Sequence, residues 1–296
     1  LTHNAKGVLP PAHPLLVASS PSYEPVRDLY READLVLGIG TEFSETDYDF
    51  FFDGGFALGG SLIRIDIDAA QLSRNVRPAL AIQSDARLAL EALLEKLEPA
   101  EREGAARTAA VNKALLPLDN EHYQQFLDTL QQALPGAALL GDSTQPAYFA
   151  AAQYHAPAPR RFASAATGYG TLGYALPAAF GARLGLPDTP VVALIGDGGL
   201  QFTINELSTA VEARLSVAVV VWNNERYEMI AQNFESVGMA PIACDIHTPD
   251  FLAIARGYGC EALRGRTLEE LAAALSASRQ ADVPTIIEAR EEDFLG

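Results

Sequence analysis

Residues 191–200 read Val191-Val192-Ala193-Leu194-Ile195-Gly196-Asp197-Gly198-Gly199-Leu200. Five apolar residues that end at a glycine are typical of a strand buried inside a parallel sheet. A second apolar run, Val217–Trp222, ends in Asn223-Asn224-Glu225-Arg226. The residues between the two runs favour a helix. A strand, a helix and a second strand in this order predict a parallel αβ unit.

The same alternation extends outward from these two strands. We expect strands at Ala138–Gly141, Val191–Ile195, Val217–Trp222 and Thr285–Glu288. We expect helices at Gln145–Gln153, Leu172–Leu184, Thr203–Ala213, Pro249–Tyr258 and Leu268–Gln280. The pattern predicts a doubly wound parallel sheet, in which ligands bind beyond the carboxyl ends of the strands.

The first third of the chain predicts a separate α/β unit, residues 1–97. Its expected elements are strands at 34–40 and 61–67 and a helix at 85–97. Residues 98–120 are rich in Glu, Arg and Ala and predict a charged linker or an exposed helix. The predicted fold class is therefore α/β with doubly wound parallel sheets, a partial domain at 1–97 and a second domain at 121–296.

Composition excludes several classes of partner. The chain has 21 Lys and Arg residues against 38 Asp and Glu residues, a net charge of −17, which disfavours nucleic acid and anionic membrane surfaces. No apolar run approaches the ~20 residues of a membrane span. Cys244 and Cys260 lack metal-like spacing, so we expect reduced thiols in a cytoplasmic protein.

Polar side chains follow the two central strands where each one ends. Asn224 comes 27 positions after Asp197 (224 − 197), a distance that fits one helix and one strand. The carboxylate and the amide offer the oxygen ligands that Mg²⁺ prefers, with phosphate and water completing the shell. Gly198 and Gly199 would let a diphosphate approach the backbone. Together these loops predict a magnesium–diphosphate anchor.

Gly-Asp-Gly followed by Asn-Asn at this distance resembles the cofactor signature of thiamine-diphosphate-dependent enzymes. The resemblance implies that Asp197, the Asn224 side chain and the Arg226 carbonyl hold Mg²⁺. It also places Gly196, Gly198 and Gly199 beside thiamine diphosphate.

Residues 167–179 resemble the segment that holds the aminopyrimidine ring in acetolactate synthases and related decarboxylases. The resemblance implies that the Gly170 carbonyl accepts a hydrogen bond from the 4′-amino group. It implies that Leu172 bends the cofactor so that its 4′-imino nitrogen can take the C2 proton. A simple core position for Leu172 is also compatible with the sequence. Gln145 matches a family position at the diphosphate, whereas Pro146 replaces a common His.

Two other readings compete. Gly168, Gly170 and Gly173 also spell a dinucleotide-binding motif, with Asp197 as a candidate ribose ligand, which would indicate an NAD-dependent dehydrogenase. The preceding residues 160–166 are poor buried-strand sequence, and Asn223-Asn224 has no role in that scheme. A non-catalytic homologue that keeps the fold is the third possibility. Titration with each cofactor separates the three.

The resemblance covers nearly the whole chain. Residues 2–10 and 63–68 are similar to the central domain of the family, and residues 121–296 to its diphosphate-binding domain. The chain starts at Leu1, which suggests a truncated or cleaved product without the N-terminal pyrimidine-binding domain. In the family that domain carries a glutamate essential for catalysis, so we expect these 296 residues alone to be inactive.

The loop after the first strand differs from that of acetolactate synthases. It reads Glu42-Phe43-Ser44-Glu45-Thr46-Asp47. In acetolactate synthases this loop carries an arginine that binds the carboxylate of the second 2-oxo acid, and the loop also contacts FAD. Their tryptophan after Asn-Asn is replaced by Asn233. Acetolactate synthesis therefore remains the alternative activity, and we expect no FAD.

The acidic loop favours a cationic substrate, because a guanidinium pairs well with carboxylates. The pattern is most similar to 5-guanidino-2-oxopentanoate decarboxylases of arginine catabolism. This resemblance implies non-oxidative decarboxylation to 4-guanidinobutanal. Alternatively, each of these acidic residues belongs to a solvated loop and binds no substrate. The family binds its cofactor between subunits, which implies a homodimer or tetramer. The candidate substrate-binding residues are Glu42, Glu45, Asp47, Tyr227 and Glu228.

Overall fold

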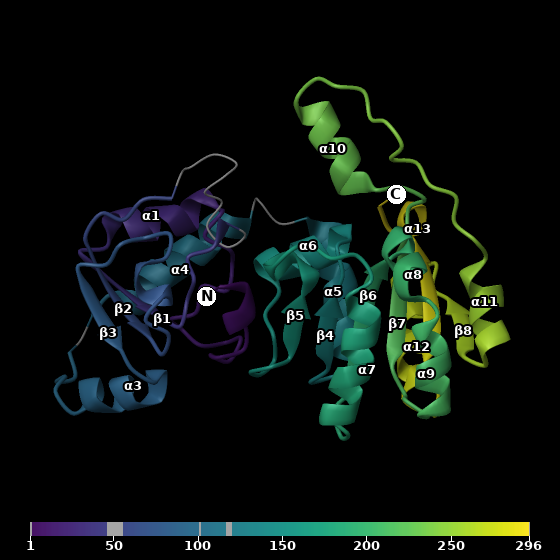
Figure 1. Ribbon diagram of the computed structural model, residues 1–296, viewed down its shortest axis with the longest axis horizontal. Helices are drawn as coiled ribbons and strands as arrows, with labels where there is room; N and C mark the ends of the chain where they lie inside the picture. Colours follow the sequence, from purple (N-terminus) through teal and green to yellow (C-terminus); the bar gives the residue numbers. More distant parts are fainter. Residues whose placement is uncertain (1, 46–55, 101, 117–119, 296) are drawn as a thin grey trace. The chain divides into compact units, whose positions relative to one another are not determined.

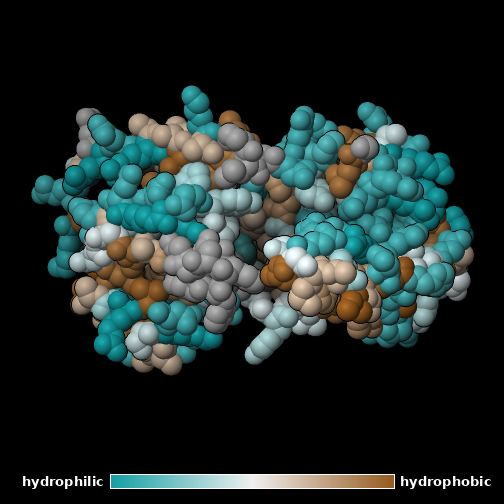
Figure 2. Space-filling view, turned by 90° about the horizontal axis from the view of Figure 1, so that it is seen from above, coloured by the Kyte–Doolittle hydropathy of each residue, from teal (hydrophilic) through white to brown (hydrophobic). Residues whose placement is uncertain are grey.

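The computed structural model describes residues 2–45, 56–100, 102–116 and 120–295. The chain divides into two compact units (Figure 1). The first comprises Leu1–Thr2 and Ala12–Leu118, and the second comprises His3–Pro11 and Asp119–Gly296. Each described helix is too short or too polar to cross a membrane. Apolar side chains reach the surface between larger hydrophilic areas (Figure 2).

The second unit is built on a six-stranded parallel sheet in the order β5-β4-β6-β7-β9-β8. The strands are β4 (Ala138–Gly141), β5 (Phe162–Ser164), β6 (Val191–Gly196), β7 (Ala218–Asn223), β8 (Glu261–Arg264) and β9 (Thr285–Arg290). Both central strands are buried along their whole length, as expected for a sheet covered on both faces. The predicted α/β fold class is confirmed.

Alternate side chains of the central strands enter two separate cores. Val192 and Leu194 pack on the face that carries α5 (Glu121–Ala133), α6 (Gln145–Gln153) and α12 (Leu268–Ser278). Val191 and Ile195 pack on the opposite face. That face carries α7 (Ala175–Gly185), α8 (Asp197–Thr203), α9 (Glu206–Glu212) and α11 (Phe251–Tyr258). This alternation follows from the two-residue period of a strand.

Several predicted elements need correction. The helix expected at 203–213 is α9, and a separate helix before it, α8, begins at Asp197 and was not predicted. The helix expected from Leu172 begins only at Ala175, because Gly173 adopts a left-handed φ of +85°. The prediction that residues 160–166 lack a buried strand is wrong, since β5 lies there. The strand β8, the helix α10 (Glu228–Ser236) and the short α13 (Glu291–Leu295) were not predicted.

The first unit contains a three-stranded parallel sheet in the order β1-β2-β3. Its elements are α1 (Glu24–Glu32), β1 (Leu35–Ile39), β2 (Ser61–Asp66), β3 (Leu80–Gln83), α3 (Ala86–Leu94) and α4 (Gly104–Leu115). Helix α4 occupies much of the segment predicted as a charged linker or exposed helix. Its Asn112 amide donates to the Leu16 carbonyl at 3.0 Å, and Leu115 is buried.

A buried arginine organises the loops at the carboxyl end of this sheet. Arg64 donates to the carbonyls of Thr41 and Arg74, each at 2.6 Å. Its guanidinium lies over the Phe43 ring, 4.9 Å from the centroid. A buried guanidinium is costly unless it has hydrogen-bond acceptors, so Arg64 requires these carbonyls. Its contacts therefore hold residues 41–43 and 74 around one side chain.

Residues 3–11 form a strap that belongs to the second unit. Lys6 is 3% exposed and donates from Nζ to the Tyr154 carbonyl at 3.0 Å. Gly7 has a φ of +86°, and a Cβ there would lie 2.0 Å from the Ala158 carbonyl oxygen. The strap therefore needs glycine for its backbone conformation and for its close approach to residue 158.

Gly7→Ala should lower the free energy of unfolding far more than Gly136→Ala does. Both glycines have positive φ, which costs roughly 1–2 kcal/mol for alanine, but no atom lies within 4 Å of a Cβ at Gly136. Only the Gly7 variant must also push the strap off Ala158. Urea denaturation measures both changes, and equal losses would contradict this account of the strap.

Candidate active site

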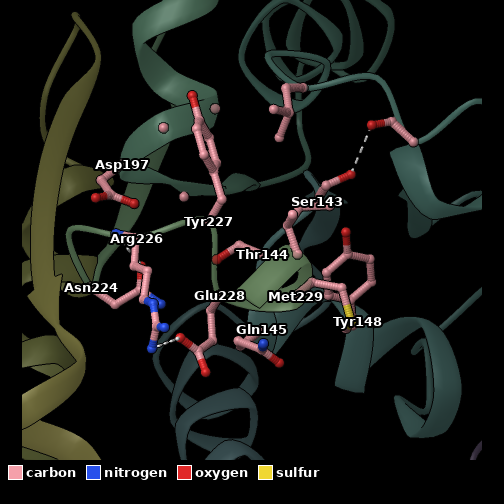
Figure 3. Close-up of a pocket in the computed structure, with 16 residues that line it drawn as sticks. Ser143, Thr144, Gln145, Tyr148, Asp197, Asn224, Arg226, Tyr227, Glu228 and Met229 are labelled. Carbon is pink, nitrogen blue, oxygen red and sulfur yellow. Dashed lines mark hydrogen bonds and ion pairs between the residues drawn. The ribbon is translucent and has the colours of Figure 1, made fainter. Parts of the chain in front are cut away.

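A cavity of about 150 Å³ opens at the carboxyl ends of β4, β6 and β7 (Figure 3). These strands lie side by side, and α10 lies beyond their ends (Figure 1). The cavity is lined by many of the residues predicted for the cofactor: Gln145, Gly170, Leu172, Gly196, Asp197, Gly198, Gly199, Asn224 and Arg226. The candidate substrate residues Tyr227 and Glu228 line it as well. The structure thus gathers side chains from four separate sequence segments.

Asp197 is the most buried carboxylate that faces the cavity. It is 2% exposed, and its Oδ2 atom has no hydrogen-bond partner among the described residues. Desolvation is the main reason that its pKa rises from 3.8 to about 6, although backbone N–H groups of Gly198 and Glu225 oppose the rise. A buried carboxylate oxygen without a partner is suited to a cation, because a cation supplies the missing interaction.

Asn224 lies beside Asp197 because β6 and β7 pair in parallel, with Gly196 opposite Trp222. Glu225 has a φ of +56°, which turns the chain sharply after Asn224. In this turn Asn224 Oδ1 accepts from the Arg226 N–H at 3.2 Å. A hydrogen bond from a later segment stabilises the turn, because the Ile246 N–H donates to the Glu225 carbonyl at 2.9 Å. The predicted metal ligands therefore share one edge of the sheet.

The two glycines after Asp197 are required by their neighbours. A Cβ at Gly198 would lie 2.5 Å from the Tyr227 ring, and one at Gly199 would lie 2.8 Å from Asp142 Oδ1. The sequence argument assigned both glycines to diphosphate approach. In the structure, packing against Tyr227 and Asp142 also excludes larger side chains at these positions.

Asp142 is an important residue that the sequence argument left without a role. It is fully buried at the end of β4 and accepts from the N–H groups of Ser143, Gly173 and Ala175 at 2.9–3.3 Å. Burial raises the pKa of Asp142, and these hydrogen bonds partly offset the rise. The carboxylate holds the loop before α7 against β4. A signal was present, since Gly141-Asp142 repeats the Gly-Asp pair that ends β6.

The loop held by Asp142 carries Gly170 and Leu172. Gly170 has a φ of +64°, and its carbonyl accepts from Ser143 Oγ at 3.1 Å (Figure 3). Leu172 is half-buried, lines the cavity and is absent from both hydrophobic cores of the described second unit. A wall of the cavity is therefore a better description of Leu172 than a core position.

Acidic residues surround Arg226 at the α10 side of the cavity. Its guanidinium pairs with Glu228 at 3.4 Å, Glu235 at 3.3 Å and Asp245 at 3.1 Å. Glu228 also accepts from Gln232 at 3.0 Å. This cluster sets one cation against three carboxylates, of which Glu228 lines the cavity and Glu235 and Asp245 lie outside it.

The remaining predicted substrate residues belong to the first unit. Glu42 is exposed and pairs with Arg74 at 3.4 Å, and Glu45 is exposed. Asp47 lies outside the described residues. Their role in substrate binding therefore stays a prediction. Cys244 and Cys260 are both buried and free of disulfides, as expected.

No cluster of three His, Cys, Asp or Glu side chains forms a metal site within the described ranges. The candidate site instead combines one carboxylate with neutral oxygens, and this donor set fits Mg²⁺ together with a phosphate group. The unpartnered Oδ2 of Asp197 is the observation that supports the fit.

In the presence of a chelator, Asp197 should make stability fall as pH rises. Between its unfolded pKa of 3.8 and its folded pKa of about 6, the folded chain keeps a proton that the unfolded chain has lost. The stabilising contribution is complete below the first value and is lost through the second, a change of about 3 kcal/mol. Comparison of parent and Asp197→Asn unfolding between these pH values measures it.

Mg²⁺ with thiamine diphosphate should restore stability above pH 6 in the parent, because a cation favours the ionised carboxylate. Asp197→Asn should gain little. Parallel pH profiles for the two proteins would show that Asp197 is not the titrating group.

Comparisons with known proteins identify the family of this chain. Residues 142–289 match the family model described as the thiamine pyrophosphate enzyme C-terminal TPP binding domain, and residues 1–93 match the model of the central domain. A Pseudomonas aeruginosa protein named "Probable 2-ketoarginine decarboxylase" is 39% identical over 298 residues, which cover 96% of this chain and 52% of that protein.

Two further relatives have other names. Benzoylformate decarboxylase from Pseudomonas aeruginosa is 33% identical over 261 residues, covering 86% of this chain and 48% of that protein. The large subunit of acetolactate synthase isozyme 1 from Escherichia coli is 30% identical over 275 residues, covering 88% and 48%. The chain spans about half the length of these curated relatives.

Proposed function

The chain belongs to the thiamine pyrophosphate enzyme family, and we propose that it forms the cofactor-anchoring part of an enzyme that decarboxylates a 2-oxo acid to an aldehyde. The observation that carries the proposal is the buried carboxylate of Asp197, whose Oδ2 has no hydrogen-bond partner among the described residues and which lies beside Asn224 at the edge of the sheet. When bound, thiamine diphosphate supplies the electron sink that loss of CO₂ requires.

The residues of this chain would bind and orient that cofactor. Asp197, the Asn224 side chain and the Arg226 carbonyl would hold Mg²⁺, and Mg²⁺ would hold the diphosphate. Gln145 and the glycines after β6 would lie along the diphosphate. The Gly170 carbonyl would accept a hydrogen bond from the aminopyrimidine ring, since its present donor, Ser143 Oγ, can rotate away.

Leu172 would pack against the bound cofactor and enforce its bent form. Leu172→Ala should therefore slow exchange of the cofactor C2 proton, while Leu172→Met, which keeps the bulk, should retain most of the rate. Exchange in bound cofactor can be followed by NMR with the enzyme at its full natural length. An unchanged rate in Leu172→Ala would leave Leu172 with a packing role only.

We further propose a cationic substrate, with 5-guanidino-2-oxopentanoate as first choice and 4-guanidinobutanal as product. The name of the 39% identical relative supports this choice, and so does the excess of carboxylates around Arg226. Glu228 is the best-placed of these acids, because it lines the cavity and its side chain is 22% exposed. Glu42, Glu45 and Asp47 stay candidates for the same task.

Glu228→Gln should lower kcat/KM for the guanidino acid about tenfold more than for an uncharged 2-oxo acid of equal length. This factor corresponds to about 1.4 kcal/mol, close to the lower end of the roughly 1.5–3 kcal/mol for a hydrogen bond to a charged group. Glu235→Gln is the matched control, because Glu235 pairs with the same arginine but does not line the cavity. Aldehyde release by the full-length protein is the assay.

Equal losses for both acids would remove Glu228 from substrate recognition. Acetolactate as the main product from pyruvate would instead favour the alternative activity, which the 30% identical acetolactate synthase keeps open. In that case the cofactor site would stand and the substrate proposal would fail.

A cytoplasmic homodimer or tetramer completes the proposal. Ile230, Val237, Met239 and Ile242, in and after α10, are each more than half exposed. Apolar surface of this kind beside a cavity fits burial by a second copy.

A further inference from the structure

Glu291 lies next to Asn224 because of the register of β7 and β9. Asn223 pairs with Arg290 in this parallel ladder, so the residues that follow each of them leave the sheet together. Glu291 Oε2 accepts from the Asn224 side-chain amide at 3.3 Å and from Trp222 Nε1 at 2.7 Å. Two donors from β7 and the turn after it therefore converge on one carboxylate oxygen.

The indole of Trp222 gives this carboxylate a fixed place. Trp222 is 1% exposed and packs edge-on against Phe126, with ring centroids 5.1 Å apart. An indole N–H can only donate. Since the ring cannot move within its core, its hydrogen bond holds Glu291 at the end of β9.

A carboxylate in this place favours one orientation of the Asn224 amide, and the Arg226 N–H, which donates to the amide oxygen, favours the same one. An amide group presents NH₂ on one side and oxygen on the other, and a carboxylate accepts hydrogen bonds only. Glu291 therefore selects the rotamer with NH₂ toward itself. The oxygen then lies on the side of Arg226, whose N–H it meets at 3.2 Å. The opposite rotamer would set oxygen against carboxylate oxygen.

We propose that Glu291 is a positioning residue that keeps the Asn224 oxygen available as a metal ligand. The inference rests on the proposed Mg²⁺ site and assigns no contact between Glu291 and the ion. Glu291 acts by excluding the amide orientation that would present NH₂ to a cation. Partners of this kind typically change metal affinity 10- to 100-fold.

The test is calorimetric titration of Mg²⁺ into the full-length protein with thiamine diphosphate present. Glu291→Leu, which offers no acceptor to Asn224, should weaken Mg²⁺ binding by roughly 10- to 100-fold. Glu291→Gln should keep most of the affinity, because the Trp222 N–H can only donate and holds the glutamine oxygen where it still accepts from Asn224. The thermal unfolding midpoint of Glu291→Leu, measured beside the titration, shows whether the variant is folded. Glu292→Gln is the charge control, because Glu292 is exposed and pairs only weakly, at 3.7 Å, with Arg290.

A second background separates orientation from charge. In Asn224→Asp the carboxylate presents an oxygen to the cation in either rotamer, so no partner is needed to orient it. The new carboxylate also faces Glu291, which has the same charge. In that background Glu291→Leu should leave Mg²⁺ affinity unchanged or increase it. An equal loss in both backgrounds, or an equal loss with Glu292→Gln, would overturn the positioning role.

The proposed metal site and the positioning role can fail separately. If Asp197→Ala and Asn224→Ala leave Mg²⁺ affinity unchanged, the metal site is wrong and the role of Glu291 falls with it. If those variants abolish binding while Glu291→Leu matches the parent, only the positioning role is overturned.

Discussion

The desolvated carboxylate of Asp197 is the constraint on which the arrangement of the site depends. One oxygen of a fully buried acid has no partner in the described chain, and the pKa of the acid is raised to about 6. Such a group destabilises a folded protein at neutral pH unless a cation joins it. Asp197 follows the fully buried strand β6, whose backbone is hydrogen-bonded on both sides, to β4 and to β7.

A comparison with Asp142 shows that burial of an aspartate does not by itself indicate a ligand-binding role. Both aspartates follow a glycine at the end of a central strand, and burial raises the pKa of each. The oxygens of Asp142 are taken by three backbone N–H groups, so this acid secures a loop. Asp197 keeps one oxygen free for a ligand. The difference lies in the partners, which a sequence does not display.

The strongest sequence signals were those that depend on local periodicity. The strand Ala138–Gly141 and the helix Gln145–Gln153 have the predicted bounds. Asp197 and Asn224 follow the paired strands β6 and β7 and line one cavity, as expected. The edge strand β5 was missed because it is only three residues long, and β8 was missed because it is four residues long and partly exposed. Glu291 could not be found from sequence, because its contact with Asn224 depends on a register between strands 67 residues apart.

The strap at residues 3–11 has a consequence for the order of folding. Lys6 reaches its acceptor on Tyr154 across 148 residues of chain, and the first unit is inserted within that span. During synthesis the strap emerges well before the surface against which it packs. The Lys6 ammonium, which is buried in the folded unit, therefore stays in solvent while the inserted unit forms. Closing so long a loop costs entropy, although the cost grows only slowly with length. The second unit can therefore complete its packing only after the ribosome has delivered both of its separated segments.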